Sequence, residues 1–251
     1  MNSDRKFALV TGVLFIITII ASIPAVYVFY APVLNDPNYI VGSGADTRVF
    51  WGAFLEVITA LACIGTAVVL FPIVKRQDEA VALGYVAVRV LEATIIVVGI
   101  VSLLSVVTLR QNLAGDAGAD AASLLTAGES LVAFHDWTFL LGPGVLAGLG
   151  NGLLLGYLMY RSGLVPRRLA LLGLIGGPLQ FASANAMLFE LYEQISVWAV
   201  IAVLPEFVWE LSLGIWLIVK GFDPSAAILS EPYKTDLNDG HKGKEISLSK
   251  A

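Results

Sequence analysis

Long runs of apolar residues, broken by few polar positions, account for most of the first 220 residues. The runs lack the period-two alternation of barrel strands, and they are longer than the helices of a soluble core. At about 1.5 Å per residue, each run is long enough to cross the roughly 30 Å hydrocarbon core of a bilayer as a helix. The pattern therefore predicts six membrane-spanning helices, at residues 8–30, 50–74, 80–109, 137–160, 169–191 and 196–219.

Composition supports the same class of protein. Of the 251 residues, 57% are hydrophobic and only 14% are charged, a balance unlike that of a soluble domain. After residue 220 the chain becomes polar, with too few apolar residues to form a core. We therefore expect an all-α, six-helix transmembrane bundle at 1–220 and a disordered polar tail at 221–251. The net charge of −5 is dispersed, which does not favour nucleic-acid binding.

The basic residues predict how the bundle is oriented. Twelve of the fifteen Lys and Arg residues fall at one end of the predicted spans, whereas Arg48 and Arg110 fall at the other end. Loops rich in Lys and Arg tend to remain in the cytoplasm, so both termini are predicted to be cytoplasmic. The single cysteine, Cys63, lies within the second span, so the chain forms no internal disulfide and no cysteine-based metal site.

Two segments are expected at the outer face. The first, 31–49, contains two prolines and two glycines and is predicted to be a short exposed loop. In the second, 110–136, Asp120 is placed to cap a helix that lies in the interface or leads into the fourth span. The residues that this helix is expected to bury are Leu124, Leu131 and Phe134. His135 follows them, and a solvated histidine is the ordinary interpretation there, with a proton-transfer role as the alternative.

Several charged and amide side chains fall inside the predicted spans at similar depth. Counted at about 1.5 Å per residue from the cytoplasmic helix ends, five of them lie roughly 14–18 Å deep: Arg89, Glu92, Asn151, Gln180 and Glu210. On the same count Glu206 is about 21 Å deep, and Glu56 is about 27 Å deep, near the outer interface. A charge at the centre of a membrane helix costs about 2.5–3.5 kcal/mol, so these groups are expected to face the bundle interior and to pair.

The charges of this polar layer do not cancel, because four glutamates accompany a single arginine, Arg89. Glu92 lies one turn along the same helix and Glu210 lies at matching depth on the sixth span, so either is a candidate partner. The surplus acids must be protonated, reach water or meet a cation from outside the chain. The alternative is a structural Arg89–Glu210 pair, with the other acids neutral or wetted near the helix ends.

Four glycines recur at every fourth residue of the fourth span: Gly144, Gly148, Gly152 and Gly156. Such a glycine strip lets another helix approach closely. The neighbouring helix belongs either to the same chain or to a second molecule, a copy of this chain or another membrane protein. The last three spans contain prolines, each of which removes a backbone donor and can bend its helix: Pro143, Pro178 and Pro205.

Four stretches of the membrane region stand out together: GVLFIITIIAS at 12–22, RVLEA at 89–93, LGYLMYRSGLVP at 155–166 and ELSLGIWLIVKG at 210–221. In order and spacing they resemble a bacterial family of integral membrane proteins, the domain of unknown function 4386. The resemblance extends over nearly the whole membrane region. It implies a multi-pass protein of the bacterial inner (plasma) membrane, but it implies no activity and assigns no functional residues.

No catalytic motif accompanies the polar layer. The chain contains neither His-Glu-x-x-His nor Gly-x-Ser-x-Gly, and it has no Walker-type phosphate loop. An enzyme acting on a lipid through Glu206 or Glu210 is therefore the least supported interpretation, and no metal or other cofactor is expected. The favoured hypothesis is a small carrier or ligand-binding protein whose acid-rich layer handles a proton or a cationic ligand. The alternative is a non-catalytic subunit that assembles with another membrane protein through the glycine strip.

Overall fold

The computed structural model describes residues 3–42, 44–115 and 120–230, and within these ranges all regular structure is helical. The helices are α1 (Ser3–Pro24), η1 (Ala25–Phe29), α2 (Ala31–Asn35), α3 (Asp46–Val74), α4 (Glu79–Gly115), α5 (Ala121–Phe139), η2 (Leu140–Leu146), η3 (Gly148–Leu155), α6 (Gly156–Ser162), α7 (Arg167–Leu188), α8 (Val197–Val219) and α9 (Ala227–Ser230), where η denotes a π-helix. In the described part of the chain, six helical segments are long and apolar enough to cross a membrane. The predicted six-helix bundle is therefore confirmed.

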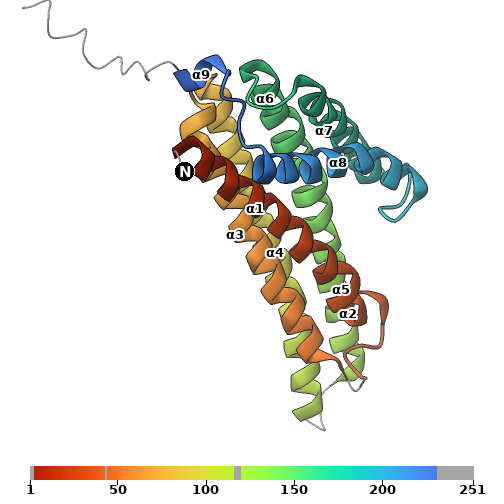
Figure 1. Cartoon of the computed structure of the whole chain (residues 1–251). Coiled ribbons are helices and arrows are strands. Elements are labelled where there is room, and N and C mark those ends of the chain that lie inside the picture. The colour runs from red at the N-terminus through yellow and green to blue at the C-terminus, as the bar shows by residue number, and fades with distance from the viewer. Residues whose placement is uncertain (1–2, 43, 116–119, 231–251) are drawn as a thin grey trace, which may run out of the picture.

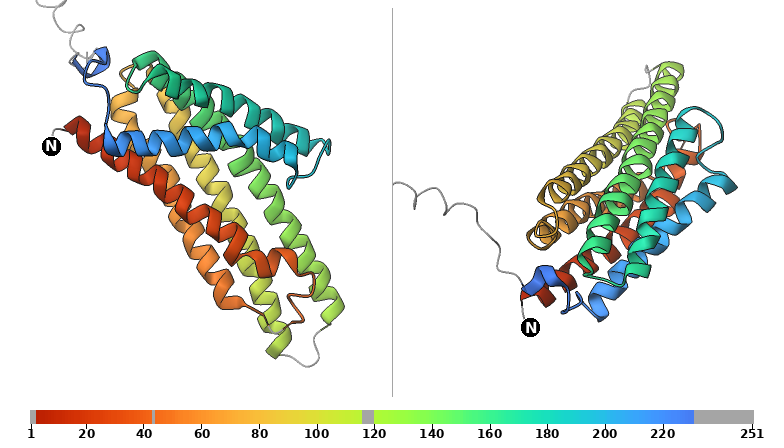
Figure 2. Two further views of the ribbon diagram at one scale, coloured as in Figure 1. Left: turned by 45° about the vertical axis from the view of Figure 1, so that its right-hand side comes forward. Right: turned by 90° about the horizontal axis from the view of Figure 1, so that it is seen from above.

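Two groups of helices meet at the end of the molecule that carries the N-terminus. Helices α1, α3, α4 and α5 run together along the long axis, and the α7–α8 hairpin splays away from them (Figure 1, Figure 2). α1 and α8 touch near the N-terminal end, where a Cβ atom on Gly12 would lie 2.6 Å from the carbonyl oxygen of Gly214. The Arg5 guanidinium donates a hydrogen bond to the Leu217 carbonyl oxygen at 2.7 Å, which ties the start of α1 to the end of α8.

The fourth span is longer than predicted. It begins at Ala121 rather than near residue 137, and it continues through α5, η2, η3 and α6 to Ser162. Asp120 caps its first turn, because a carboxylate oxygen accepts a hydrogen bond from the backbone N–H of Ala122 at 3.1 Å. The predicted cap and its continuation into the span are thus confirmed. Helix α4 has 37 residues and spans about 55 Å, so α4 and α5 project together beyond the hydrocarbon core.

This projection changes the expected outer face. Segment 31–49 is not simply an exposed loop, since it contains α2 and buries Val33, Tyr39 and Ile40 against Leu103 and its apolar neighbours on α4. The apolar surface of α4 that stands outside the hydrocarbon core would otherwise face water. Segment 31–49 covers that surface, and burying it stabilises the fold.

The buried face of α5 also differs from the expectation. Leu124 and Leu131 pack, partly buried, against the same apolar cluster, but the Phe134 side chain is 51% exposed. The buried stripe continues at helical spacing through Gly128 and His135 instead. The inward position after Leu131 is therefore occupied by His135, and the expectation that this histidine is solvated at the interface is wrong.

An ion pair at the outer end holds the two longest helices and the covering segment together. The Arg110 guanidinium on α4 donates from Nε to the Asp46 carboxylate on α3 at 2.6 Å, and the Tyr39 hydroxyl donates to the same carboxylate at 2.7 Å. Burial raises the pKa of the Tyr39 phenol above its ordinary value, and the hydrogen bond to Asp46 makes a second, smaller contribution in the same direction. Arg110, one of the two arginines that the charge pattern placed at the outer end, therefore has a structural role.

The first ten residues of the predicted disordered tail are folded. Gly221 adopts a left-handed φ of 78°, which ends α8. Phe222 and Ala226 are then buried in the main apolar cluster, and the Asp223 backbone N–H donates to the Leu164 carbonyl oxygen at 2.9 Å. The disorder prediction therefore began too early in the chain. The rest of the predicted tail, residues 231–251, lies outside the described residues.

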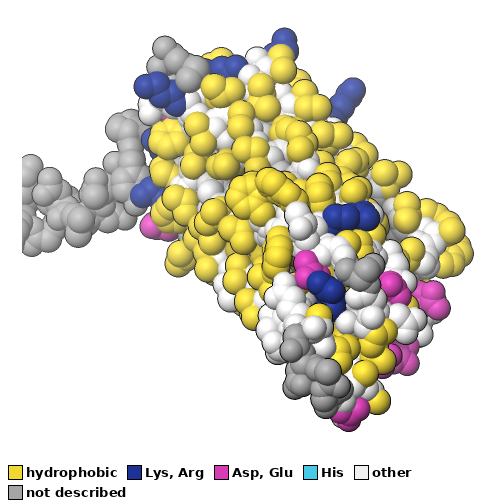
Figure 3. Space-filling model, turned by 90° about the horizontal axis from the view of Figure 1, so that it is seen from below, with side chains coloured by type: hydrophobic (Ala, Val, Ile, Leu, Met, Phe, Trp, Pro, Cys, Tyr) yellow, Lys and Arg dark blue, Asp and Glu magenta, His cyan; other side chains and the backbone are white. Residues whose placement is uncertain are grey.

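The surface of the bundle is largely apolar along its length. Figure 3 shows hydrophobic side chains over the middle of the visible face, with Lys and Arg toward both ends and Asp and Glu gathered mainly at the lower end of the view. This distribution fits contact with a lipid bilayer through the middle and contact with water at both ends.

Candidate functional site

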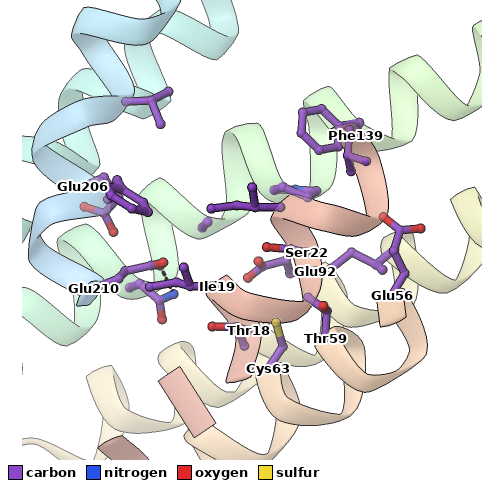
Figure 4. Close-up of a pocket in the computed structure, with 18 of the residues that line it drawn as sticks. Thr18, Ile19, Ser22, Glu56, Thr59, Cys63, Glu92, Phe139, Glu206 and Glu210 are labelled. Atoms are coloured by element: carbon purple, nitrogen blue, oxygen red, sulfur yellow. Dashed lines mark hydrogen bonds between the residues drawn. The ribbon is translucent and has the colours of Figure 1, made fainter. Parts of the chain in front are cut away.

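A cavity of about 240 Å³ lies in the membrane region, bounded by α1, η1, α3, α4, the π-helical part of the fourth span, α7 and α8. Figure 4 shows polar side chains that reach it from several of these helices. The five polar residues that the sequence placed at one depth line this cavity together with Glu206 and Glu56, which it placed nearer the outer face: Arg89, Glu92, Asn151, Gln180, Glu210, Glu206 and Glu56. The fold therefore gathers side chains from five different spans around one cavity.

Arg89 is paired within its own helix. Its side chain is 2% exposed, and Nη1 lies 2.6 Å from Oε2 of Glu92, one turn further along α4. The guanidinium Nε has no hydrogen-bond partner among the described residues. The alternative pairing of Arg89 with Glu210 is not formed, because Glu210 accepts a hydrogen bond from the Asn151 amide instead.

Asn151 connects three helices through its side chain and backbone. Its Nδ2 donates to Glu210 on α8, and its Oδ1 accepts from the Tyr85 hydroxyl on α4 at 3.3 Å. The backbone oxygen of Asn151 accepts from Trp209 Nε1 at 3.0 Å. One N–H donor and one acceptor site of this buried amide are thus used, and the bond from Nδ2 fixes the Glu210 carboxylate to the cavity wall.

Glu206 has no such support. Its side chain is only 2% exposed, and neither carboxylate oxygen has a hydrogen-bond partner among the described residues. Buried polar groups are nearly always hydrogen-bonded, and an isolated buried carboxylate is costly unless it is protonated or meets a cation. No group of three His, Cys, Asp or Glu residues in the described part of the chain is arranged to hold a metal ion.

Close packing of glycines on α7 and on the fourth span lets Glu206 reach its buried position at the cavity. A Cβ atom on Gly176 of α7 would lie 2.5 Å from the backbone nitrogen of Glu206, and one on Gly152 would collide with its carboxylate. The glycines let the α8 backbone approach α7 and let the carboxylate pass between helices. Larger residues at these positions would push Glu206 away from the cavity.

The glycine strip faces a helix of the same chain. Cβ atoms on Gly148 and Gly152 would clash with the backbone at Gly177 of α7, and one on Gly156 would lie 3.1 Å from the Leu174 nitrogen. Gly144 is looser, since its nearest neighbour would be 3.5 Å away. The neighbouring helix that the sequence left open is therefore α7.

The fourth span is π-helical where it borders the cavity. The π-helices η2 and η3 cover Leu140–Leu146 and Gly148–Leu155, and Pro143 lies within the first of them. Gln180 Nε2 donates to the Pro143 carbonyl oxygen at 2.8 Å, so an α7 side chain hydrogen-bonds this irregular backbone. Helices α7 and α8 remain α-helical through Pro178 and Pro205. Local π geometry is frequently found at functional sites.

A second group of titratable side chains lies at the outer end of the cavity. His135 is 3% exposed and packs edge-to-face on Tyr30, with ring centroids 5.8 Å apart. The Glu56 carboxylate, which lines the cavity, interacts electrostatically with His135. His135 Nδ1 lies 3.6 Å from a carboxylate oxygen of Asp136, whose side chain is 56% exposed. His135 is therefore a neighbour of Glu56, which lines the cavity, and of Asp136, which is exposed at the surface.

Sequence reasoning missed the small polar residues of the cavity. Thr18 and Ser22 come from α1, and Thr59 and Cys63 come from α3. Each pair is four residues apart and therefore lies on one face of its helix. That spacing of small polar side chains within an apolar run was the signal that could have marked the cavity faces of both helices.

Comparison with known proteins identifies a family. The family model described as "Domain of unknown function (DUF4386)" matches residues 10–221. No curated protein and no solved structure matches the chain. The matched residues contain every side chain that lines the cavity, because these residues run from Thr18 to Glu210. The chain belongs to the DUF4386 family.

Proposed function

We propose that this membrane protein is a small carrier or ligand-binding protein that takes up a proton or a small cation in the acid-lined cavity. The observation that carries the proposal is Glu206, a carboxylate that is 2% exposed, lines the cavity and has no hydrogen-bond partner among the described residues. A cation or a proton would complete the environment of this group, which the surrounding protein leaves unsatisfied.

The charge balance of the cavity supports the same function. Four glutamates line it with one arginine, and Arg89 is already paired with Glu92 at 2.6 Å. Glu206, Glu210, Glu92 and Arg89 interact electrostatically with one another, so adding a positive charge affects the whole group. In a medium of low effective dielectric such interactions are stronger than in water, which favours a cation over an anion or a neutral molecule.

We further propose that both termini are cytoplasmic and that the protein lies in the bacterial inner membrane. The start of α1 and the end of α8 lie at the same end of the bundle, joined by the Arg5–Leu217 hydrogen bond. Lys75, Arg76 and Arg161 belong to the loops and helix ends on that side of the membrane, as the positive-inside rule requires for a cytoplasmic face.

The test is the thermal stability of the purified full-length protein between pH 5 and pH 9, with Na⁺, K⁺, methylammonium or tetramethylammonium added. Three proteins are compared: wild type, Glu206→Gln, and Glu193→Gln as a control at an exposed glutamate. A cation present at a concentration of 100 times its Kd adds about 2.7 kcal/mol to the free energy of unfolding. For a chain of this size, that raises Tm by roughly 5–10 °C.

We expect wild type and Glu193→Gln to show a Tm that depends on pH and on at least one cation, and Glu206→Gln to lose both responses. The substitution keeps the shape of the side chain and removes only its ability to ionise. If Glu206→Gln responds as wild type does, or if no protein responds, the cavity is a structural polar core and the proposal is wrong.

A further inference from the structure

We infer that the ligand is an amphiphilic organic cation, a quaternary or protonated amine with an apolar tail, which reaches the cavity sideways from the bilayer between α1 and α8. The inference rests on the proposed cation site and adds the substrate class and the route. It follows from where the cavity opens, what lines the opening and which charges lie inside.

The opening lies between the first and last spans. Of the residues that line the cavity, only Ile23, Tyr27 and Val203 are also exposed on the outside of the protein, at 44%, 66% and 36%. Ile23 belongs to α1, Tyr27 to η1 and Val203 to α8. A lining residue that is also exposed marks the mouth of a cavity, so the mouth lies where α1 and η1 face α8.

The shape of the bundle explains why a mouth exists there. α1 and α8 are in backbone contact at Gly12 and Gly214, and Arg5 binds the last carbonyls of α8. From that crossing the two helices diverge (Figure 1, Figure 2). The two helices therefore touch at the end carrying the termini, and the cavity-lining residues Ile23 and Val203 belong to the membrane-spanning part of each helix.

Lipid tails, rather than water, surround the mouth. The residues next to it on the outer surface are apolar and largely exposed: Ile20 at 66%, Val200 at 64% and Leu204 at 53%. An apolar surface of this kind on two spanning helices faces the hydrocarbon core. A ligand that passes between Ile23 and Val203 therefore travels through an apolar opening before it meets the carboxylates.

The side chains inside the cavity indicate the chemistry of the ligand's head group. Glu206 has both carboxylate oxygens unpaired, and Phe207 and Phe139 add aromatic rings to the cavity wall. Carboxylates and aromatic faces together are the environment that organic ammonium groups prefer. A strongly hydrated metal ion would lose its water at the apolar mouth, and an anion would be repelled by the surplus glutamates. A cavity of about 240 Å³ accommodates the head group while the tail stays in the mouth.

The experiment measures equilibrium binding of two radiolabelled probes with the same head group, tetramethylammonium and hexyltrimethylammonium, to the full-length protein in nanodiscs of phosphatidylglycerol, a lipid without an ammonium group. Binding to protein-free discs is subtracted. The variants are Ile23→Trp, which fills the mouth, Ile20→Trp as a matched lipid-facing control that does not line the cavity, and Glu206→Gln.

We expect hexyltrimethylammonium to bind at least about tenfold more tightly, since each methylene that leaves water contributes up to about fourfold. Ile23→Trp is expected to remove most of this difference and Ile20→Trp to preserve it, while Glu206→Gln abolishes binding of both probes. If the probes bind equally and Ile23→Trp has no effect, the cation site stands but the lateral route is wrong.

Other outcomes overturn more. If neither probe binds and stability does not respond to pH, the proposed function itself fails. If hexyltrimethylammonium still binds Glu206→Gln, the tail alone drives association and the cationic substrate class is wrong. A final arm adds phosphatidylethanolamine to the nanodiscs, and if this lipid displaces the probe, the occupant is a lipid head group and not a free amphiphile.

Discussion

At the scale of single residues, the cavity contains two kinds of buried charge. Arg89 and Glu92 form an ion pair across one helical turn at 2.6 Å, so this pairing does not depend on other helices. Glu206 has no equivalent partner among the described residues. The paired charges suit a structural role and the unpaired one suits binding, because a group that is already neutralised has little to gain from a ligand.

Replacing Arg89 with methionine is expected to destabilise the protein by about 3–5 kcal/mol, because it leaves the Glu92 carboxylate buried without its cation. The double variant Arg89→Met/Glu92→Met should recover much of this loss, since it removes both charges and keeps the volume apolar. Thermal unfolding in one detergent measures the difference, with the exposed Arg161→Met as the control. A double variant no more stable than Arg89→Met would show that Glu92 is not the main partner.

At the scale of elements, the contact between the fourth span and α7 positions the cavity. Glycines on both helices bring the backbones together, and Gly176 of α7 in turn admits Glu206 of α8. The π-helical course of the fourth span brings Asn151 and the Pro143 carbonyl to the same space. A change in the helix–helix distance here would therefore move several cavity residues together.

Gly152→Ala is expected to lower stability by about 1–3 kcal/mol, because the new methyl group meets the α7 backbone at Gly177, which cannot move independently of its helix. Gly144→Ala is the matched control in the same strip, with a nearest neighbour at 3.5 Å, and should be neutral or slightly stabilising. Comparing the two Tm values checks the difference. Equal values would argue against close packing at Gly152.

At the scale of the whole molecule, the charge distribution and the even number of spans set the topology. The N-terminus and the end of α8 lie together, and the α7–α8 connection lies at the opposite end (Figure 1). The Asp46–Arg110 ion pair closes the far end of the longer helix group. The molecule therefore has two different ends, and only one of them is rich in basic residues.

Single-cysteine labelling is expected to place these ends on opposite sides of the membrane. In a Cys63→Ala background, which removes the only native cysteine, Glu193→Cys between α7 and α8 should react with a membrane-impermeant maleimide in intact cells. Glu79→Cys at the start of α4 should react only after lysis. The reverse pattern would mean that the termini face outward.

Much of this fold follows from local properties of the chain. Lipid satisfies no backbone hydrogen bonds, so each long apolar run must be a helix whatever its neighbours are. The Asp120 cap could also be predicted from local sequence, because a capping side chain bonds to backbone groups in the first turn of its own helix. Position along each helix could also be counted from the sequence, and the five polar residues that this count placed at one depth line one cavity.

The direction in which each side chain points around its helix axis could not be predicted from the sequence. Depth allowed Arg89 to pair with Glu92 or Glu210, and the choice depended on which way the side chains of α4 and α8 turn once packed. His135 was misjudged for the same reason, since its burial requires Tyr30 from a distant segment. The folding of residues 221–230 likewise required an apolar surface that the rest of the chain provides.

The sequence by itself therefore determined the number of spans and which polar side chains fall within them, because these depend on the length and polarity of single segments. Only the tertiary structure decided which groups meet, that Glu206 has no hydrogen-bond partner among the described residues, and that Ile23 of α1 and Val203 of α8 both line the cavity and are exposed. The physical reason is that partnership and shape arise from contacts between helices far apart in the chain, and no single segment contains that information.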